Sequence, residues 1–138
     1  MKKIKSIAKL VEEVATLLQR LVRIKAAVHA DSDGYVKCCS CHKFYHWKDM
    51  DGGHYLSRKY TATKIRIENI HPQCKGCNGW GDASVGHEYY LYMVEMYGEN
   101  AVRQLTAEKH KTKKHNRTEL EELKIHYKKL IADLEKEL

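Results

Sequence analysis

Four cysteines in this 138-residue sequence have the spacing of metal ligands. Cys38 and Cys41 form one Cys-x-x-Cys pair, Cys74 and Cys77 form another, and the 32 residues from 42 to 73 lie between them. Two such pairs supply the four thiolates that tetrahedral Zn²⁺ prefers. The alternative is two unrelated pairs of buried thiols. We expect a structural zinc ion with no open coordination position, which would close a loop that a small core cannot hold alone.

The use of cysteine also indicates the cellular compartment. The sequence has five cysteines, so Cys39 is a spare thiol, while His42 or His46 could replace one sulfur as a ligand. An odd number of cysteines, four of which form two Cys-x-x-Cys pairs, favours metal binding in a reducing compartment over disulfide bonds. Charges such as Lys5 and Glu12 interrupt what would be the apolar segment of a signal peptide. We therefore expect a cytoplasmic protein.

A second set of polar residues lies between and just after the cysteine pairs. Asp51 and His54 flank two glycines, Asn69 precedes the second pair, and Asn78 follows Cys77 directly. A neutral imidazole can take a proton from water near pH 7, and oxygen ligands can hold a hard divalent cation beside a pentacovalent phosphate. The set therefore suits phosphodiester hydrolysis with one metal ion. A histidine hydrogen-bonded within the zinc fold is the alternative for His54.

This arrangement resembles the zinc-containing branch of the HNH nucleases, the ββα-metal class. The resemblance implies that His54 activates water, that Asn69 holds the loop between two strands, and that Asn78 helps to bind catalytic Mg²⁺ or Mn²⁺. The sequence departs from the common pattern at Gly53, where many relatives carry an Asp or His that also binds this metal. Asp51 is the substitute ligand that we expect, with capping of a turn at Gly52-Gly53 as its alternative role.

From about Leu21 onward, the order of features is similar to the phage NinG/Rap recombination endonucleases. The resemblance rests on Cys38-x-x-Cys41, Asp51-Gly52-Gly53-His54-Tyr55, Glu68-Asn69-Ile70-His71-Pro72-Gln73-Cys74, Cys77-Asn78, Tyr97-Gly98-Glu99-Asn100-Ala101-Val102 and a final basic helix. It implies a metal-dependent endonuclease that cleaves branched DNA, notably Holliday junctions, in phage recombination within a bacterial cytosol. Resolution of a four-way junction requires a cut in each of two symmetry-related strands. A C₂ homodimer with one active site per subunit is the simplest enzyme that can make both cuts.

The expected fold is α+β and mainly helical, with a small zinc-stapled ββα-metal (HNH) core between long terminal helices. We divide the chain into an amphipathic helix over 1–30, a nuclease core with following helices over 31–108, and a basic connector with a last helix over 109–138. Thr118 and Glu121 match a capping box for that last helix. The apolar stripes of both terminal helices suit pairing between subunits or packing on the chain's own core.

The shorter elements are predicted from local composition. Short strands are expected over 35–37, 44–47 and 63–70, because these segments are rich in aromatic and β-branched residues. A turn is expected over 31–34, a short helix from Lys75, a helix over 87–97 ended by Gly98, and further helix over 100–108.

The charge balance favours a polyanionic partner. Lys and Arg total 25 against 18 Asp and Glu, a net charge of +7, and no apolar run approaches the length that spans a bilayer. We therefore expect DNA and no membrane. The candidate phosphate contacts, which are otherwise solvated surface charges, are Arg58, Lys109, Lys111, Lys113, Lys114 and Arg117.

Two other functions fit the same residues. A general HNH nuclease of the nicking or restriction type would cut linear duplex as readily as junctions. A non-catalytic zinc module that binds DNA or a recombination partner is supported by Gly53, which stands where a metal ligand is common. A thiol-disulfide protein is disfavoured because no βαβ pattern surrounds the cysteines.

Overall fold

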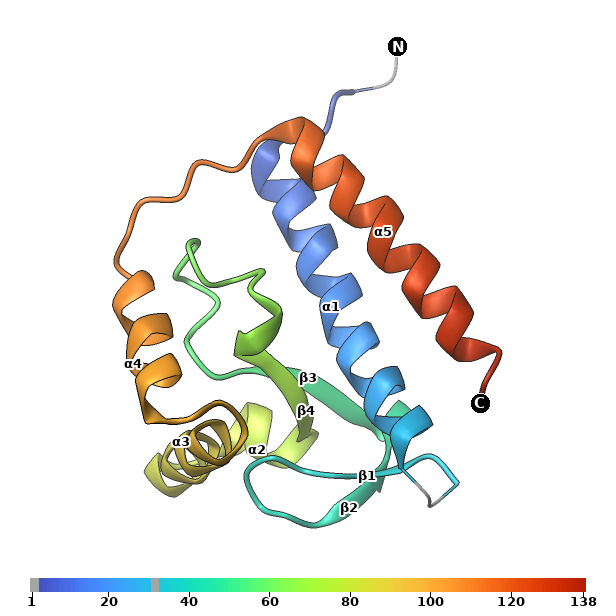
Figure 1. The fold of residues 1–138 in the computed structure, drawn as a ribbon, viewed down its shortest axis with the longest axis vertical. Helices are drawn as coiled ribbons and strands as arrows, with labels where there is room; N and C mark the ends of the chain where they lie inside the picture. The colour runs from blue at the N-terminus through green and yellow to red at the C-terminus, as the bar shows by residue number, and fades with distance from the viewer. Residues whose placement is uncertain (1–2, 31–32) are drawn as a thin grey trace.

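Two long helices from the ends of the chain lie side by side, and the first of them packs on small antiparallel sheets (Figure 1). The computed structural model describes residues 3–30 and 33–138. Helix dominates and the strands form only two-stranded sheets, so the predicted mainly helical α+β class is confirmed. Within the described ranges, no helix has both the length and the apolar character that crossing a bilayer requires.

Polar side chains cap both terminal helices. Helix α1 (Ile7–His29) follows Ser6, whose hydroxyl accepts a hydrogen bond from a backbone amide of the first turn. Helix α5 (Arg117–Glu135) follows Asn116, whose side-chain oxygen accepts hydrogen bonds from the backbone amides of Thr118 and Glu119. The predicted cap at Thr118 is therefore wrong, because Asn116 already satisfies the amide donors of this helix.

The apolar stripes of α1 and α5 pack against each other within one chain. Leu10, Val14 and Leu18 of α1 are fully buried, and Leu120 and Ile131 of α5 belong to the same core cluster. Packing on the chain's own core was one of the two uses expected for these stripes. Pairing between subunits would need a different surface.

The two strands predicted around the first cysteine pair form a hairpin. Strand β1 (Tyr35–Lys37) pairs antiparallel with β2 (Phe44–His46). The predicted turn at 31–34 is described only from residue 33, and the residues 31 and 32 lie outside the described ranges. Asp33 and Gly34 both have positive φ, at 52° and 88°, which fits a turn at this position.

The second sheet contains Gly52 and Gly53, the pair at which the alternative role of Asp51 required a turn. Strand β3 (Met50–His54) pairs antiparallel with β4 (Ile70–Cys74), in a register that places Gly53 opposite His71. The turn at Gly52-Gly53 is therefore wrong. The glycines instead allow close approach, since a Cβ at Gly52 would lie 2.5 Å from the Cα of Gln19 in α1.

The segment 63–70 was expected to be a strand, and that expectation is also wrong. It runs as a loop and a 3₁₀ turn (Ile67–Asn69), and the strand begins only at Ile70. The side chain of Asn69 explains the difference, because it hydrogen-bonds the backbone of this loop and holds it in a non-extended path.

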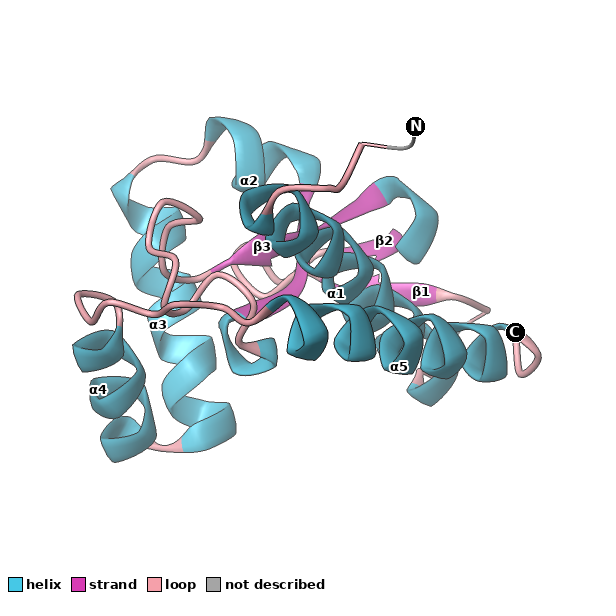
Figure 2. Ribbon diagram, turned by 90° about the horizontal axis from the view of Figure 1, so that it is seen from above, coloured by secondary structure: helices cyan, strands magenta, loops and turns pink. Residues whose placement is uncertain are grey.

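Three helices lie between the second sheet and α5 in the chain. They are α2 (Lys75–Trp80), α3 (Ala83–Tyr97) and α4 (Glu99–Glu108), so the predicted short helix and the predicted helical segments after it are present. Gly98 separates the last two with φ of 89°. Buried side chains of α3 and α4 form a second small core with Cys39 and Leu56. In both views α4 lies at the opposite end of the molecule from the C-terminus (Figure 2).

The contact between β3 and α1 leads to a stability prediction. Gly52→Ala should lower the free energy of unfolding by about 1–3 kcal/mol, because the added Cβ would press on the backbone of α1 at Gln19. Gly79→Ala in α2 is the matched control, since nothing lies within 4 Å of its Cβ position. Urea unfolding of both variants in the presence of zinc measures the difference, and equal stabilities would contradict this account.

Candidate metal centre and active site

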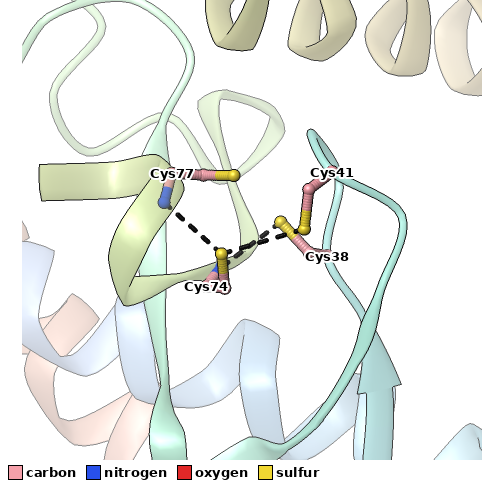
Figure 3. A group of neighbouring side chains, drawn as sticks. All are labelled: Cys38, Cys41, Cys74 and Cys77. Carbon is pink, nitrogen blue, oxygen red and sulfur yellow. Dashed lines mark hydrogen bonds between the residues drawn. The ribbon is translucent and has the colours of Figure 1, made fainter. Parts of the chain in front are cut away.

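The four paired cysteines converge on one point, as the sequence predicted (Figure 3). The sulfurs of Cys38, Cys41, Cys74 and Cys77 all lie within 4.8 Å of one another. Tetrahedral Zn²⁺ with Zn–S bonds of about 2.3 Å separates its sulfurs by about 3.8 Å. The sulfurs of Cys41 and Cys74 lie 3.9 Å apart. The cluster therefore fits a structural zinc ion.

Backbone amides donate hydrogen bonds to the sulfurs, as expected at a thiolate site. The amides of Ser40 and Cys74 reach the sulfur of Cys38 at 3.4 and 3.3 Å, and the amide of Cys77 reaches the sulfur of Cys74 at 3.4 Å. The hydrogen bond from the Cys39 thiol, the largest contributor, and the amides of Cys74 and Ser40 lower the pKa of Cys38 against the opposing effect of burial. Burial and the neighbouring thiols raise the pKa of Cys77. A divalent cation would allow all four sulfurs to ionise together.

The other candidate ligands of this centre lie elsewhere. His42 has a positive φ and pairs with Glu88 at 3.0 Å, and the side chain of His46 accepts a hydrogen bond from the backbone of Lys48. Neither histidine replaces a sulfur in the cluster. Cys39 is buried and lies outside the four-sulfur group, and its hydrogen bond with Cys38 and its burial raise its pKa.

A second site is a cleft of about 490 Å³ beside β3. It brings together four residues that the sequence singled out as candidate site residues, and three more. The lining residues are Gln19, Asp51, Gly52, His54, Ser57, Arg58 and Asn78. The cleft therefore combines an imidazole, a carboxylate, an amide and a guanidinium, drawn from β3, α2, α1 and the loop 55–69.

His54 is oriented by a single backbone contact. Its Nε2 donates a hydrogen bond to the carbonyl oxygen of Lys64 at 2.8 Å, because a carbonyl can only accept. The proton is thus on Nε2, and Nδ1 is left as the acceptor. Burial lowers the pKa of His54, despite the opposing effect of the Lys64 carbonyl. The imidazole is therefore neutral near pH 7 and can accept a proton at Nδ1.

Asp51 and Asn78 meet across the cleft. One carboxylate oxygen of Asp51 accepts a hydrogen bond from the Asn78 amide at 3.0 Å, and the other pairs with Lys75 at 2.8 Å. Burial opposes ionisation of Asp51, but these two contacts outweigh it and lower its pKa. The ionised carboxylate and the amide oxygen of Asn78 are suitable ligands for Mg²⁺ or Mn²⁺. Any such ion would share the carboxylate with Lys75.

The structure explains why Gly53 cannot supply another ligand. A Cβ at Gly53 would lie 2.0 Å from the side-chain oxygen of Gln73 in the paired strand. Gln73 is itself buried and donates a hydrogen bond to Ser40 at 3.0 Å. Among the residues described, the cysteine cluster is also the only group of three or more His, Cys, Asp or Glu side chains placed to share a metal ion.

Asn69 does not line the cleft but holds the loop above it. It is fully buried and accepts a hydrogen bond from the amide of Leu56 at 2.7 Å. Its amide donates to the carbonyls of Leu56 at 3.1 Å and Thr63 at 3.2 Å. The side chain therefore closes the loop that carries Arg58 and the Lys64 carbonyl.

The predicted DNA contacts lie on two neighbouring segments. Arg58 lines the cleft, whereas the basic residues of 109–117 lie on the connector between α4 and α5 and on the first residue of α5. The connector meets the loop 55–69, since Lys109 lies 5.2 Å from the ring centre of Tyr60 and His115 contacts the carbonyl of Thr61 at 3.3 Å. The basic segment thus adjoins the loop that borders the cleft.

His71 lies on the other side of the second sheet, among tyrosines. Tyr89 donates to the carbonyl of Gly53 at 2.7 Å, so its oxygen accepts from Nδ1 of His71 at 3.1 Å. Nε2 of His71 then accepts from the hydroxyl of Tyr97 at 2.7 Å. These hydrogen bonds connect β3 to α3. Burial lowers the pKa of His71 to about 4.

Comparison with protein families gives one match. The model of the bacteriophage lambda NinG protein family matches residues 1–137. The chain belongs to the NinG family. No curated protein and no solved structure matched it. The NinG part of the resemblance is thus confirmed, and the match includes α1, which lies mostly before the part of the chain in which the motifs were found.

Several contacts of this NinG-family site were not predictable from motifs. Gln19 enters the cleft from α1, Lys75 pairs with Asp51, and the tyrosines around His71 come from α3. Only Lys75 carried a sequence signal, because its position between Cys74 and Asn78 places it at the start of α2.

The cysteine cluster predicts a specific zinc content. Wild-type protein should hold one zinc ion per chain, and Cys74→Ser should lose it and unfold at lower temperature, because structural zinc contributes directly to folding. Cys39→Ser is the control, since Cys39 is buried nearby but lies outside the cluster. Metal analysis and thermal unfolding measure both effects. Full zinc content in the Cys74 variant would contradict the assignment.

Burial of neutral His71 predicts a loss of stability in acid. Its pKa is about 4 when folded against 6.5 normally, so between these values the unfolded chain binds a proton that the folded chain does not. Stability should therefore fall as pH drops through this window, by about 2 kcal/mol between pH 7 and pH 5. Urea unfolding of wild type and His71→Gln at both pH values isolates this contribution from that of the zinc thiolates. An equal pH dependence in the two proteins would disprove it.

Proposed function

We propose that this NinG-family chain is a metal-dependent, structure-selective DNA endonuclease that cleaves branched DNA, notably Holliday junctions, in phage recombination. The observation that carries the proposal is the cleft that gathers His54, Asp51, Asn78 and Arg58. Each of these residues has a chemical type that phosphodiester hydrolysis requires.

The order of elements around the cleft supports the ββα-metal assignment. Strands β3 and β4 are antiparallel, and α2 follows β4 directly. His54 ends the first strand and Asn78 lies on the helix, as the resemblance to HNH nucleases implies. The loop between the strands is closed by buried Asn69, in keeping with the role that the resemblance implies for it.

The residues of the cleft divide the chemistry between them. Nδ1 of His54 accepts a proton from the attacking water, and the guanidinium of Arg58 binds non-bridging phosphate oxygens. Asp51 and Asn78 would hold Mg²⁺ or Mn²⁺, which supplies positive charge to the phosphate when bound. The ion pair of Lys75 with Asp51 keeps this carboxylate ionised and oriented.

Binding of the DNA backbone would extend from the cleft along the basic connector. Arg58, Lys111, Lys113, Lys114 and Arg117 are exposed, which leaves them accessible to phosphates. Such contacts would give salt-dependent affinity without base recognition. Because the apolar stripes of α1 and α5 pack within one chain, the homodimer proposed for symmetric junction cleavage would use another face.

One observation favours a second candidate, a non-catalytic zinc module that binds DNA. The cleft has a single carboxylate, Gly53 has no room for a ligand, and Lys75 is paired with Asp51. A site that had lost its metal would look similar. A general HNH nuclease that also cuts linear duplex is the remaining alternative.

The deciding experiment is cleavage of a labelled four-way junction beside the matching linear duplex, with Mg²⁺, with Mn²⁺ and with EDTA. His54→Ala should lower the cleavage rate by about 100-fold or more while zinc content and junction binding persist, because it removes the base without touching the cysteine cluster. His126→Ala, an exposed position on α5, is the control.

The outcomes separate the candidates. Metal-dependent cuts confined to the junction and lost in His54→Ala support the proposed function, whereas equal cutting of duplex supports the general nuclease. Tight junction binding with no cleavage by wild type under any metal condition supports the non-catalytic module. Full activity of His54→Ala would refute His54 as the base.

A further inference from the structure

The loop 55–69 controls two groups of the cleft at once. It carries Arg58, which lines the cleft, and it carries the Lys64 carbonyl that accepts the Nε2 proton of His54. Displacement of Lys64 would therefore remove the only hydrogen bond that the His54 ring makes within the described residues. The position of this loop fixes both the tautomer and the orientation of the imidazole.

Asn69 holds only part of this loop. Its side chain bonds the backbone at Leu56 and Thr63, so it closes the part of the loop between them. Other attachments at Thr61 and Arg66 lead to the connector and to α4 rather than to the cleft. An attachment on the side of the cleft has to come from another element.

Glu12 on α1 provides that attachment. One carboxylate oxygen accepts a hydrogen bond from Arg58 at 2.7 Å, and the other pairs with the ammonium group of Lys64. The Lys64 side chain is 13% exposed and that of Glu12 is 45% exposed, so the lysine is largely withdrawn from water while the carboxylate still reaches solvent. The hydrogen bond from Lys64, the largest contributor, lowers the pKa of Glu12, and the carboxylate is ionised at neutral pH.

We infer that Glu12 is a positioning residue of the cleft, which clamps Arg58 and Lys64 to α1 and thereby holds the Lys64 carbonyl against His54. The inference rests on the proposed function for its catalytic meaning. The geometric link from Glu12 to His54, through the side chain and then the backbone of Lys64, does not depend on it. The first helix is then part of the active site, although it carries none of the motif residues.

The neighbouring residue offers a matched control. Glu13 is also on α1 and also pairs with two basic residues, in its case Lys5 at 2.7 Å and Lys124 at 2.5 Å. Its partners lie in the N-terminal segment and on α5, and none of them lines the cleft. Glu13→Ala removes a comparable double ion pair and leaves the loop 55–69 attached.

The test combines a spectroscopic readout with kinetics on the full zinc-loaded chain. Nitrogen-15 NMR of the His54 ring should show the Nε2-protonated tautomer in wild type and in Glu13→Ala, and a mixture of tautomers in Glu12→Ala. Cleavage of the four-way junction should slow by about tenfold in kcat for Glu12→Ala, the usual size of an effect transmitted through an orienting partner. Glu12→Gln, which keeps one acceptor oxygen, should be intermediate.

Lys64→Met separates the two arms of the clamp. It removes the ammonium group but keeps the carbonyl, so it should reproduce the loss of a single His54 tautomer. Combined with Glu12→Ala it should add little further change in kcat, because both substitutions break one linkage. Loss of the Arg58 contact in Glu12→Ala alone should also change KM.

The results separate a positioning role of Glu12 from a general loss of stability and from failure of the proposed function. An unchanged His54 tautomer in Glu12→Ala, whether or not cleavage falls, would overturn the positioning role. A tautomer change in Glu13→Ala as large as that in Glu12→Ala would also overturn it, because general loss of stability would then be the cause. If wild type fails to cleave any substrate, the proposed function fails, while the tautomer comparison still decides the link between Glu12 and His54.

Discussion

The arrangement of the cleft depends on the four-sulfur cluster that joins two hairpins. Cys38 and Cys41 belong to the β1–β2 hairpin, and Cys74 ends β4 where it pairs with β3. Cys77 lies on α2 immediately before Asn78. A tetrahedral ion on these sulfurs would fix the start of α2 relative to the second sheet, where Asn78 meets Asp51. A structural metal in the cluster would thus help to determine the geometry of the neighbouring cleft.

Strand β3 is held from two directions as well as along its edge. On one side Gly52 lets the backbone of α1 approach closely. On the other, the hydrogen-bond chain from Tyr97 through His71 and Tyr89 ends on the carbonyl of Gly53. Since buried polar chains of this kind are satisfied in only one arrangement, they specify the position of the strand as well as stabilising it. Because His54 is the last residue of this strand, the same contacts determine where its backbone lies.

Local spacing allowed prediction of the cysteine cluster, the β1–β2 hairpin and the short helix after the second pair, because these features depend on neighbouring residues. The same reasoning failed at Gly52-Gly53, where glycine indicated a turn but serves close packing by α1, a segment remote in sequence. It failed again at 63–70, where Asn69 holds a loop against strand-like composition. Asp51, His54 and Asn78 lie together in the cleft. The ion pairs of Lys75 and Glu12 join segments far apart in the sequence, so the motifs did not predict their partners, although the position of Lys75 beside Cys74 placed it at the start of α2.

The charges of the cleft bear on how the proposed catalytic ion would be held. Among the residues that the structure describes, Asp51 is the only carboxylate that lines the cleft, and the ammonium of Lys75 already neutralises part of its charge. A hard cation with so few protein ligands is held weakly until other oxygens complete its coordination, and Mg²⁺ commonly takes these from substrate phosphate. Binding of metal and DNA would then be mutually dependent, with each raising the affinity for the other. In such a site, the sparse ligand set couples ion binding to the presence of a correctly placed phosphate.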